Sequence, residues 1–561
     1  MKFLIIPLLI SSFAFAQVEY PTDYFRSPLD IPIIPSGTFG ELRTNHFHAG
    51  LDIKTQQREG HNVYTIAEGY VSRIKVSHYG YGKVIYITHP NGYTSVYGHL
   101  SSYAPILEAY VKAAQYKNES YEVELFPAVD ELKVNKDEII AYSGNTGSSG
   151  GPHLHFEIRD QQERTINPLL FGLDVQDKKT PYVRGVYAYT KDDQSSVNGK
   201  IGRVELRLIP TKTKDYTVEN VTAHGTIGFG IVSYDSQDLA VNQNGINGLE
   251  TFFNGHKKFE MDFNRFSFSE SRHINRFLDY EYFKTKRNRI QKLFVEQGNV
   301  LSLYQNLDND GYVVIEDSTA SVYKVRIKDF HNNESWVTIP INGKKMPTTP
   351  NLVDTTAKTY IFADQPTNLN ETNVSVFIPA NSFYEDAYID FKVRNDTLYL
   401  HKDVIPLQKN VTITYNVSKY KDAEKEKLYI AELIGYRNYP SYLSTKRKGD
   451  VLTTSSNALG TYALVMDTQG PKISATNFQD GKWLSNFRYL KFKITDNLSG
   501  ISNYRATING KFILVEYEYK TNTLTFDFND NVVTDTKNEL KLVVTDNVGN
   551  SSTFEATFFR K

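Results

Sequence analysis

The chain has 561 residues, which exceeds the size of a single hydrophobic core and predicts three or four domains. Its 63 lysines and arginines nearly cancel its 64 aspartates and glutamates, so no overall field favours nucleic acid or an anionic membrane as partner. The chain contains no cysteine, which excludes disulfides, a lipid attached to cysteine and thiolate ligands. Any zinc must therefore be bound by histidine and carboxylate.

The N-terminus, MKFLIIPLLISSFAFAQ, has the pattern of a secretory signal peptide. Lys2 precedes an apolar run over residues 3–15, and the small residues Ala14 and Ala16 fit cleavage after residue 16. A membrane-spanning helix needs about 20 apolar residues, and no segment of the mature chain reaches that length. We therefore expect an exported protein, located in the periplasm, the cell envelope or the medium.

Histidines gather in the N-terminal third, where eight of the 13 lie between residues 46 and 155. Within this region, residues 70–77, 82–89 and 93–100 alternate between apolar and polar side chains, which predicts antiparallel strands. The Asn-Gly pair in HPNGYT predicts a hairpin turn between the last two. We therefore expect histidine chemistry on an antiparallel β-sheet.

One helix is predicted inside this sheet, over APILEAYVKAAQYK at residues 104–117. Pro105 suits the first turn of a helix. An apolar stripe at helical spacing follows, formed by Leu107, Tyr110, Val111 and Ala114. We expect this helix to be a surface insertion that flanks a groove.

The stretch GGPHLHFEIR, at residues 150–159, reads as a β-strand with two different faces. Side chains alternate with period two, so an apolar face is formed by Leu154, Phe156 and Ile158. The opposite face carries His153, His155, Glu157 and Arg159. Two imidazoles in one small volume are of little use to a structural strand and are typical of a metal site.

A second ligand pair lies upstream in NHFHAGLDIKT, where His48 and Asp52 have the spacing H-x-x-x-D. Gly50 and the β-like residues 51–55 favour a loop that enters a strand over a helix, and the two side chains can converge in either case. One imidazole from the downstream strand would complete three ligands and leave a fourth position open. That pattern is typical of a catalytic zinc and not of a closed structural one.

Three blocks of this region resemble the signature blocks of the lysostaphin/LytM-type zinc metalloendopeptidases, which cut peptide cross-links of bacterial peptidoglycan. The blocks are HFHAGLDI, GYGKVIYITHPNGYTSVYGHLS and SGNTGSSGGPHLHFEIR, and the resemblance covers residues 38–172. It implies that one zinc ion is bound by His48, Asp52 and His155. It also implies that His99 and His153 flank the metal-bound water without ligating the metal.

In the mechanism that this resemblance implies, zinc lowers the pKa of its water and polarises the scissile carbonyl. One of His99 and His153 would orient or deprotonate the water, and the other would stabilise the oxyanion or protonate the leaving amine. The sequence does not assign these two roles. No H-E-x-x-H helix supplies a glutamate base, and we expect Glu157 to support its neighbours on the strand.

The other histidines of the region have weaker claims to a role in the site. His46 could replace His48 as a ligand, but no carboxylate follows it four residues later. We expect His89 to be structural, and His61 and His78 to be surface or packing residues.

The remainder of the chain alternates long strands with polar turns, so the fold class is mainly β. We expect an antiparallel β-sheet metallopeptidase domain with a short helical insertion, followed by two or three immunoglobulin-like β-sandwich domains. Resemblance among YKVRIKDFHNNES, LKFKITDNLSG and LKLVVTDNVGNSS favours related sandwiches. The expected domains are a metallopeptidase domain at 17–172, a β-sandwich at 173–345, a β-rich domain at 346–468 and an immunoglobulin-like sandwich at 469–561.

The leading functional hypothesis is a secreted or periplasmic zinc metalloendopeptidase that acts on peptidoglycan peptides. One alternative is a catalytically inactive or autoinhibited relative that serves as a docking or activator module, and another is a peptidase that acts on proteins. The complete set of ligands and flanking histidines favours an active enzyme. We expect the C-terminal β domains to position the catalytic domain by binding glycan, an envelope protein or the catalytic groove itself.

Overall fold

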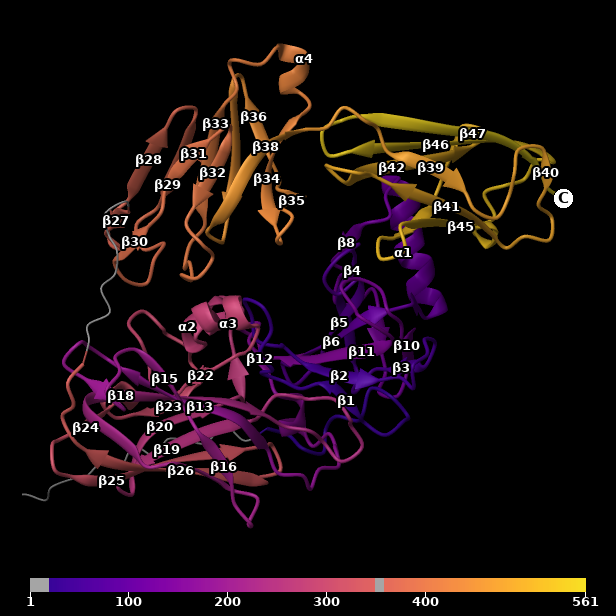
Figure 1. Cartoon of the computed structure of the whole chain (residues 1–561). Helices are drawn as coiled ribbons and strands as arrows, with labels where there is room; N and C mark the ends of the chain where they lie inside the picture. Colours follow the sequence, from indigo (N-terminus) through magenta and orange to yellow (C-terminus); the bar gives the residue numbers. More distant parts are fainter. Residues whose placement is uncertain (1–19, 349–357) are drawn as a thin grey trace, which may run out of the picture.

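The computed structural model describes residues 20–348 and 358–561, so the expected signal peptide lies outside the described residues. Figure 1 shows β-rich parts that follow one another in an arc, with the last part beside helix α1 (Pro105–Asn118) of the first. The predicted fold class, mainly β, is confirmed. Within the described ranges, no helix has the length and apolar character needed to cross a membrane. We call residues 20–176, 177–343, 358–466 and 467–561 the first to fourth parts.

The first part is built on an antiparallel sheet with the strand order β1-β2-β11-β6-β5-β4-β8. In that order its strands are β1 (Pro35–Gly37), β2 (Leu51–Lys54), β11 (His153–Arg159), β6 (Thr94–Leu100), β5 (Lys83–Thr88), β4 (Gly69–Val76) and β8 (Val123–Leu125). A second, small sheet has the order β3 (Asn62–Tyr64), β10 (Ile139–Tyr142) and β7 (Ser102–Tyr103). The predicted Asn-Gly hairpin joins β5 to β6, which pair antiparallel.

Strand β11 lies between β2 and β6 and has the two faces that its sequence predicts. On the apolar face, Leu154, Phe156 and Ile158 are fully buried in the core of the first part. On the polar face, His155 is directly opposite Asp52 of β2 on one side and Gly98 of β6 on the other. The sheet register therefore fixes which side chains meet at the centre of the polar face.

Helix α1 occupies the predicted residues, with Pro105 as its first residue and Leu107 and Val111 buried. It is not a free surface insertion, because the fourth part covers one side of it. The hydroxyl of Tyr116 donates to Asp530 at 2.7 Å, and the ammonium of Lys112 pairs with the same carboxylate.

The second part shares a hydrophobic core with the first. Phe47 is 1% exposed and its ring packs against those of Phe263 and Phe266 from the second part. A short strand pair, β12 (Thr165–Ile166) with β21 (Arg265–Phe266), also joins the two sheets. Since His48 follows Phe47 directly, the second part takes part in positioning a predicted metal ligand.

The sheet of the second part follows the order β15-β13-β18-β26-β25-β19-β20-β23. In that order the strands are β15 (Arg203–Leu206), β13 (Tyr182–Thr190), β18 (Val221–Tyr234), β26 (Glu334–Gly343), β25 (Ala320–Lys328), β19 (Gly248–Phe253), β20 (His256–Asp262) and β23 (Tyr304–Leu307). Most pairs are antiparallel, but β18 and β26 pair in parallel. Two short helices, α2 (Ile274–Phe277) and α3 (Tyr280–Lys286), face the third part (Figure 1).

The third and fourth parts each contain two sheets around a core of their own. One sheet of the third part consists of β28 (Thr367–Glu371), β29 (Val374–Ile378), β33 (Val411–Asn416), β37 (Val451–Ser456) and β36 (Lys446–Lys448). The other consists of β31 (Lys392–Arg394), β32 (Thr397–Leu400), β38 (Gly460–Met466), β34 (Leu428–Ile434) and β35 (Tyr439–Tyr442). One sheet of the fourth part consists of β39 (Lys472–Ala475), β41 (Tyr489–Thr495), β45 (Thr523–Asp527) and β44 (Val515–Glu518). The other consists of β40 (Lys482–Trp483), β47 (Ser551–Phe559), β46 (Lys537–Asp546), β42 (Ile501–Ile508) and β43 (Lys511–Ile513). The expected domain boundaries stay predictions.

Contacts between neighbouring parts close the arc into a circuit. The second and third parts meet where Arg276 pairs with Glu385 at 3.0 Å. The fourth part meets the first where the buried ammonium of Lys83 pairs with Glu516 at 3.0 Å. Leu514, beside that pair, is 2% exposed and belongs to the core of the first part.

We predict that Leu514→Asp detaches the fourth part from the first. The substitution removes a buried leucine and buries a carboxylate, which weakens the contact by about 3 kcal/mol. Small-angle X-ray scattering should then report a larger radius of gyration than for the wild type. Ile434→Asp, at an exposed residue of the third part, is the control and should leave the scattering unchanged. An unchanged radius for Leu514→Asp would contradict the prediction.

Candidate metal centre

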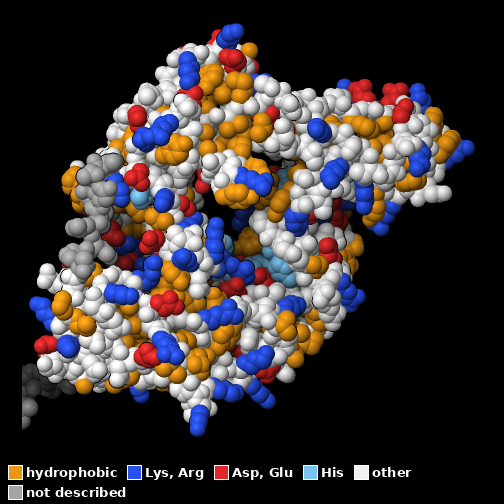
Figure 2. Space-filling view, viewed as in Figure 1, with side chains coloured by type: hydrophobic (Ala, Val, Ile, Leu, Met, Phe, Trp, Pro, Cys, Tyr) orange, Lys and Arg blue, Asp and Glu red, His pale blue; other side chains and the backbone are white. Residues whose placement is uncertain are grey.

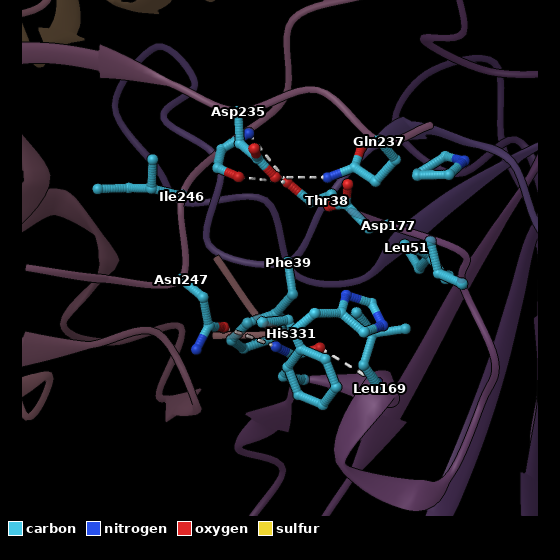
Figure 3. Close-up of a pocket in the computed structure, with 15 residues that line it drawn as sticks. Thr38, Phe39, Leu51, Leu169, Asp177, Asp235, Gln237, Ile246, Asn247 and His331 are labelled. Carbon is cyan, nitrogen blue, oxygen red and sulfur yellow. Dashed lines mark hydrogen bonds between the residues drawn. The ribbon is translucent and has the colours of Figure 1, made fainter. Parts of the chain in front are cut away.

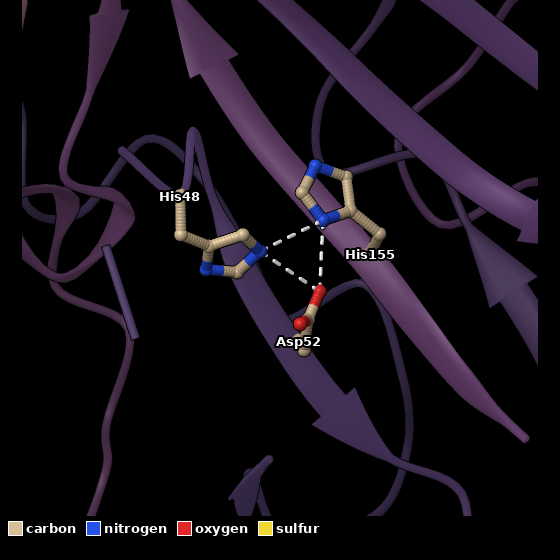
Figure 4. Close-up of side chains that lie close together, drawn as sticks. All are labelled: His48, Asp52 and His155. Atoms are coloured by element: carbon tan, nitrogen blue, oxygen red, sulfur yellow. Dashed lines mark hydrogen bonds and ion pairs between the residues drawn. The ribbon is translucent and has the colours of Figure 1, made fainter. Parts of the chain in front are cut away.

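Three predicted ligands come together at the polar face of β11. The Nε2 of His48, the Oδ1 of Asp52 and the Nδ1 of His155 all lie within 4.8 Å of one another. Oδ1 of Asp52 is 3.0 Å from the His48 nitrogen and 2.8 Å from the His155 nitrogen, and the two nitrogens are 3.2 Å apart (Figure 4). His48 lies in the loop before β2, and the other two residues are an opposed pair on β2 and β11.

The second nitrogen of each imidazole has a partner that fixes its orientation. Nδ1 of His48 donates to the carbonyl of Thr38 at 2.8 Å, and Nε2 of His155 donates to Glu157 at 2.8 Å. Each ring therefore directs its remaining nitrogen toward Asp52. This arrangement of backing acceptors is typical of histidines that bind metal.

Glu157 is itself held inside the protein by opposite charge. It is fully buried, and Nε of Arg159 donates to its Oε2 at 2.7 Å, while the hydroxyl of Tyr81 donates to its Oε1. Burial alone would raise the pKa of Glu157, but Arg159 and then His155 outweigh it and lower the pKa to about 2. Glu157 is therefore ionised at neutral pH and supports His155, as the sequence predicts.

The two ligands on the paired strands have opposite pKa shifts in the metal-free chain. Burial disfavours charge on both, but the charge of His48 and hydrogen bonds from the histidines hold the pKa of Asp52 well below its ordinary value. Asp52 and Glu157 raise the pKa of His155 to about 9 against the effect of burial. The metal-free site thus holds a proton at neutral pH that a metal ion has to displace.

The donor set fits a zinc ion. Two imidazoles and one carboxylate are typical zinc ligands, and tetrahedral bonds of about 2.0 Å place neighbouring donors roughly 3.3 Å apart. The separations of 2.8 to 3.2 Å between the three donor atoms are close to that value. With three protein ligands, one position stays open for water or substrate.

His99 and His153 lie beside this trio, as the sequence predicts. Their rings are 4.8 Å apart between centroids, and Nε2 of His153 is 3.4 Å from Oδ1 of Asp52. Nδ1 of His99 donates to the carbonyl of Thr146, and Nδ1 of His153 contacts that of Gly151, both at 2.8 Å. Nε2 of His99 is therefore left for a ligand in the site, whereas Nε2 of His153 is directed at Asp52.

His99 has two further properties of a functional residue. Its backbone has a φ of 60°, in the left-handed region that a residue with a Cβ adopts at some cost. Burial, and then the charges of His155 and His153, lower its pKa to about 3. His99 is therefore a neutral imidazole at neutral pH, and its Nε2 can accept a hydrogen bond. Figure 2 shows histidine side chains beside the hollow at the centre of the face in view.

The structure separates the other histidines from the site. His46 is exposed and contacts the carbonyl of Thr44, so it does not replace His48. His89 is buried between the carbonyl of Glu68 and the hydroxyl of Ser95, which is a structural role. The His78 ring stacks on Tyr121, and the His61 ring contacts the carbonyl of Thr55.

Two residues at the site were not identified from the sequence. Tyr81 contacts Glu157. Its only signal in the sequence was its position between Gly80 and Gly82, and in the structure both glycines have positive φ. Arg43 donates to Oδ2 of Asp52 at 3.3 Å, and nothing in its sequence context indicates this contact.

The fourth part reaches the loop beside the site. The ammonium of Lys520 donates to the carbonyls of Asn145, Gly147 and Ser149, the last two at 3.2 and 3.5 Å. The same loop holds His99 through the carbonyl of Thr146. The C-terminal part therefore contacts the segment that orients one flanking histidine.

Comparison with known families places the site inside a recognised domain. A family model described as Peptidase family M23 matches residues 46–116 and 123–168, which include all three ligands and both flanking histidines. A second model, described as a Zu5-like domain, matches residues 358–467. The first match supports the resemblance seen in the sequence.

Individual relatives match a limited share of the chain. The "Uncharacterized metalloprotease" of Haemophilus influenzae is 35% identical over 126 residues, which are 22% of this chain and 21% of that protein. The "DD-carboxypeptidase/endopeptidase Mpg" of Neisseria meningitidis serogroup B is 30% identical over 164 residues, or 29% of each protein. The chain thus spans less than a third of the length of these relatives. The catalytic domain of lysostaphin from Staphylococcus simulans is 24% identical, with 24% of this chain and 90% of that domain covered and a TM-score of 0.19.

We predict that the affinity for zinc rises with pH. Because the pKa of His155 is about 9 in the metal-free chain, the proton on this ring competes with the metal below that pH. The association constant should increase about tenfold per pH unit between pH 6 and pH 8. Competition titration with a zinc-binding dye over this range measures it, and a flat profile would contradict the prediction.

We predict that Glu157→Gln weakens the site through His155. The substitution removes the charge that pairs with the buried Arg159, which should cost about 3 kcal/mol of stability, and it should lower zinc affinity 10- to 100-fold. Thermal unfolding and zinc titration measure the two effects. Glu163→Gln is a matched control, because Glu163 pairs with the same arginine but is 66% exposed. Equal losses in both variants would argue against a specific role for Glu157.

Proposed function

We propose that this protein is a zinc metalloendopeptidase that hydrolyses peptide cross-links of bacterial peptidoglycan, because residues 46–116 and 123–168 match the model of Peptidase family M23. The observation that carries the proposal is the convergence of three donor atoms from His48, Asp52 and His155 within 4.8 Å. The name of the Neisseria relative favours D,D-peptide bonds as substrates over glycyl bridges. Cross-linked peptidoglycan lies outside the cytoplasm, which agrees with the expected export of the chain.

In this proposal the chain supplies the metal ligands and two proton carriers. Zinc, when bound by the three ligands, would polarise the scissile carbonyl and make a water molecule a better nucleophile. His99 is neutral and its Nδ1 donates to the carbonyl of Thr146, so its Nε2 would accept a hydrogen bond from the attacking water and orient it. His153 lies 3.4 Å from Asp52 and would donate a hydrogen bond to the developing oxyanion or a proton to the leaving amine.

An autoinhibited form is a second candidate, favoured by the contact of Lys520 with the loop at residues 145–149. In that form the fourth part holds the loop in place, and binding of the C-terminal parts to glycan or to an envelope protein would release it. Lys520→Ala in the full chain tests this alternative. A gain in activity would support autoinhibition, and unchanged activity would argue against it.

We predict different defects for the two histidines of β11. In the chain from residue 17, His155→Ala should lose both zinc and the release of cross-linked muropeptides, because it removes a ligand. His153→Ala should keep zinc but lower the activity about 10²- to 10⁴-fold, which is the usual effect of removing a general acid or base. Metal analysis and mass spectrometry of digested peptidoglycan measure both.

His46→Ala is the matched control, since His46 is exposed and outside the site. Wild-type protein that binds zinc but cleaves neither muropeptides nor an unfolded protein such as casein would contradict an enzymatic function and favour a docking module. Cleavage of casein without cleavage of muropeptides would instead assign a protein substrate.

A further inference from the structure

Two clusters of aspartates lie outside the metal centre, one in the second part and one in the fourth. The proximal trio is Asp177, Asp235 and Asp329. The distal trio is Asp467, Asp496 and Asp546. In each trio the three carboxylates offer oxygen atoms that lie within 4.8 Å of one another. Asp329, Asp496 and Asp546 lie in the three sequence phrases that resemble one another, and the peptidase site uses none of them.

The proximal trio is buried, and no lysine or arginine pairs with it in the described structure, although a positive charge on His331 acts on Asp177 and Asp329. Asp177, Asp235 and Asp329 are 9%, 1% and 3% exposed. Burial, and then the charges of Asp177 and Asp329, raise the pKa of Asp235 to about 8, and no lysine or arginine of the described chain appears among the groups that act on it. Three buried carboxylates without a cation are unfavourable.

One oxygen of this trio has no partner. Oδ2 of Asp235 accepts from the amide of Gln237 at 2.8 Å, but its Oδ1 is buried and lacks a hydrogen-bond donor in the described structure. The atom belongs to the group of oxygens that converge on one point. A buried acceptor of this kind costs free energy unless a donor or a cation reaches it.

Two residues of the trio, Asp177 and Asp235, border a small cavity. Its volume is about 20 Å³, which is the space of about one water molecule or one ion, and Asp177 and Asp235 line it beside Gln237 (Figure 3). Thr38 of the first part lines the same cavity, and its carbonyl accepts the hydrogen bond from His48. The cavity therefore lies at the junction of the first two parts, below the loop that carries a metal ligand.

The distal trio has the same construction. In both parts, the last aspartate begins a hairpin turn and its Oδ1 accepts from the backbone N–H of an asparagine four residues later. The distances are 2.9 Å for Asp329 and Asn333 and 2.8 Å for Asp546 and Asn550. The side-chain amide of that asparagine also donates to the carbonyl of the first aspartate of its trio, at 3.2 and 3.0 Å.

The middle residues of the trios also correspond. Asp496, like Asp235, has a buried Oδ1 without a donor among the described residues, but Asp496 is only half-buried whereas Asp235 is 1% exposed. Each of these residues directly follows a strand, β41 and β18 respectively. The same unpaired oxygen, at the same place in two separate domains, indicates a shared ligand.

We propose that each of these two parts binds one calcium ion through its trio of aspartates. Carboxylates and backbone or amide carbonyls are the ligands that calcium prefers, and it accepts six to eight of them in irregular arrangements. Magnesium usually keeps several of its waters and is seldom held by protein ligands alone. Neither trio offers histidine or thiolate, so zinc is the poorer match.

Each ion would fix the entry of the chain into a domain. Asp177 and Asp467 precede the first strands of their parts, β13 and β39, and the other aspartates of each trio come from turns at the same end. Calcium at the proximal trio would tie the first and second parts together beside Thr38. This role is independent of the proposed peptidase chemistry.

Calcium counting on the full chain tests the proposal. Protein with equimolar zinc is dialysed to equilibrium against radioactive calcium, so the peptidase site is already filled. We expect two calcium ions per wild-type chain, and one in Asp235→Asn and in Asp546→Asn. Asp193→Asn, at an exposed surface aspartate, is the matched control and should bind two. Calcium should also raise the Tm of the wild type by about 5–10 °C at 100-fold excess over Kd.

The wild-type measurements do not depend on any variant being folded. No bound calcium at 5 mM free calcium together with an unchanged Tm would overturn the proposal. A single ion that Asp235→Asn removes would leave the proximal site and overturn the distal one, and the reverse holds for Asp546→Asn. Equal displacement of the calcium by equimolar magnesium would overturn the choice of ion.

Discussion

The pairing of β2 with β11 is the constraint on which the metal centre depends. It sets Asp52 directly opposite His155, so that two ligands meet without any contribution from a flexible loop. A slip of one residue would turn His155 into the core and bring Leu154 to the site. The fully buried apolar face of β11 opposes such a slip, because it would expose Leu154, Phe156 and Ile158. Hydrophobic burial on one face therefore fixes metal geometry on the other.

Part of the site could be predicted from local periodicity, whereas the choice of His155 over His153 as ligand and the role of His99 came from the family resemblance. The alternation along residues 153–159, the H-x-x-x-D spacing and the helix after Pro105 need only short-range geometry, and the structure has all three. Tyr81 and Arg43 were missed because their contacts with Glu157 and Asp52 depend on how loops fold over the sheet. The contact between Lys83 and Glu516 spans 433 residues, and no periodic pattern indicates such a pair.

The sequence also did not indicate that the first and second parts share a hydrophobic core. The composition changes near residue 173, but Phe39 and Phe47 of the first part lie in the hydrophobic core of the second. Apolar residues in a loop look alike whether they pack within their own domain or against the next. The loop that carries His48 thus packs against the second part through Phe47. The imidazole of His48 is oriented by the carbonyl of Thr38 in the first part. The first and second parts therefore depend on each other for packing.

The closed circuit of contacts between the four parts has a mechanical consequence. An open string of bodies can bend at each joint independently, whereas a closed linkage moves only when all its joints move together or when one contact breaks. The contacts of Arg276 with Glu385 and of Lys83 with Glu516 are two such joints. A movement of the third part can therefore affect the loop beside His153 by two routes. One runs along the chain through the fourth part, and the other runs through the contact with the second part. The four parts therefore form a closed ring of contacts, and they do not move as independent domains joined by linkers.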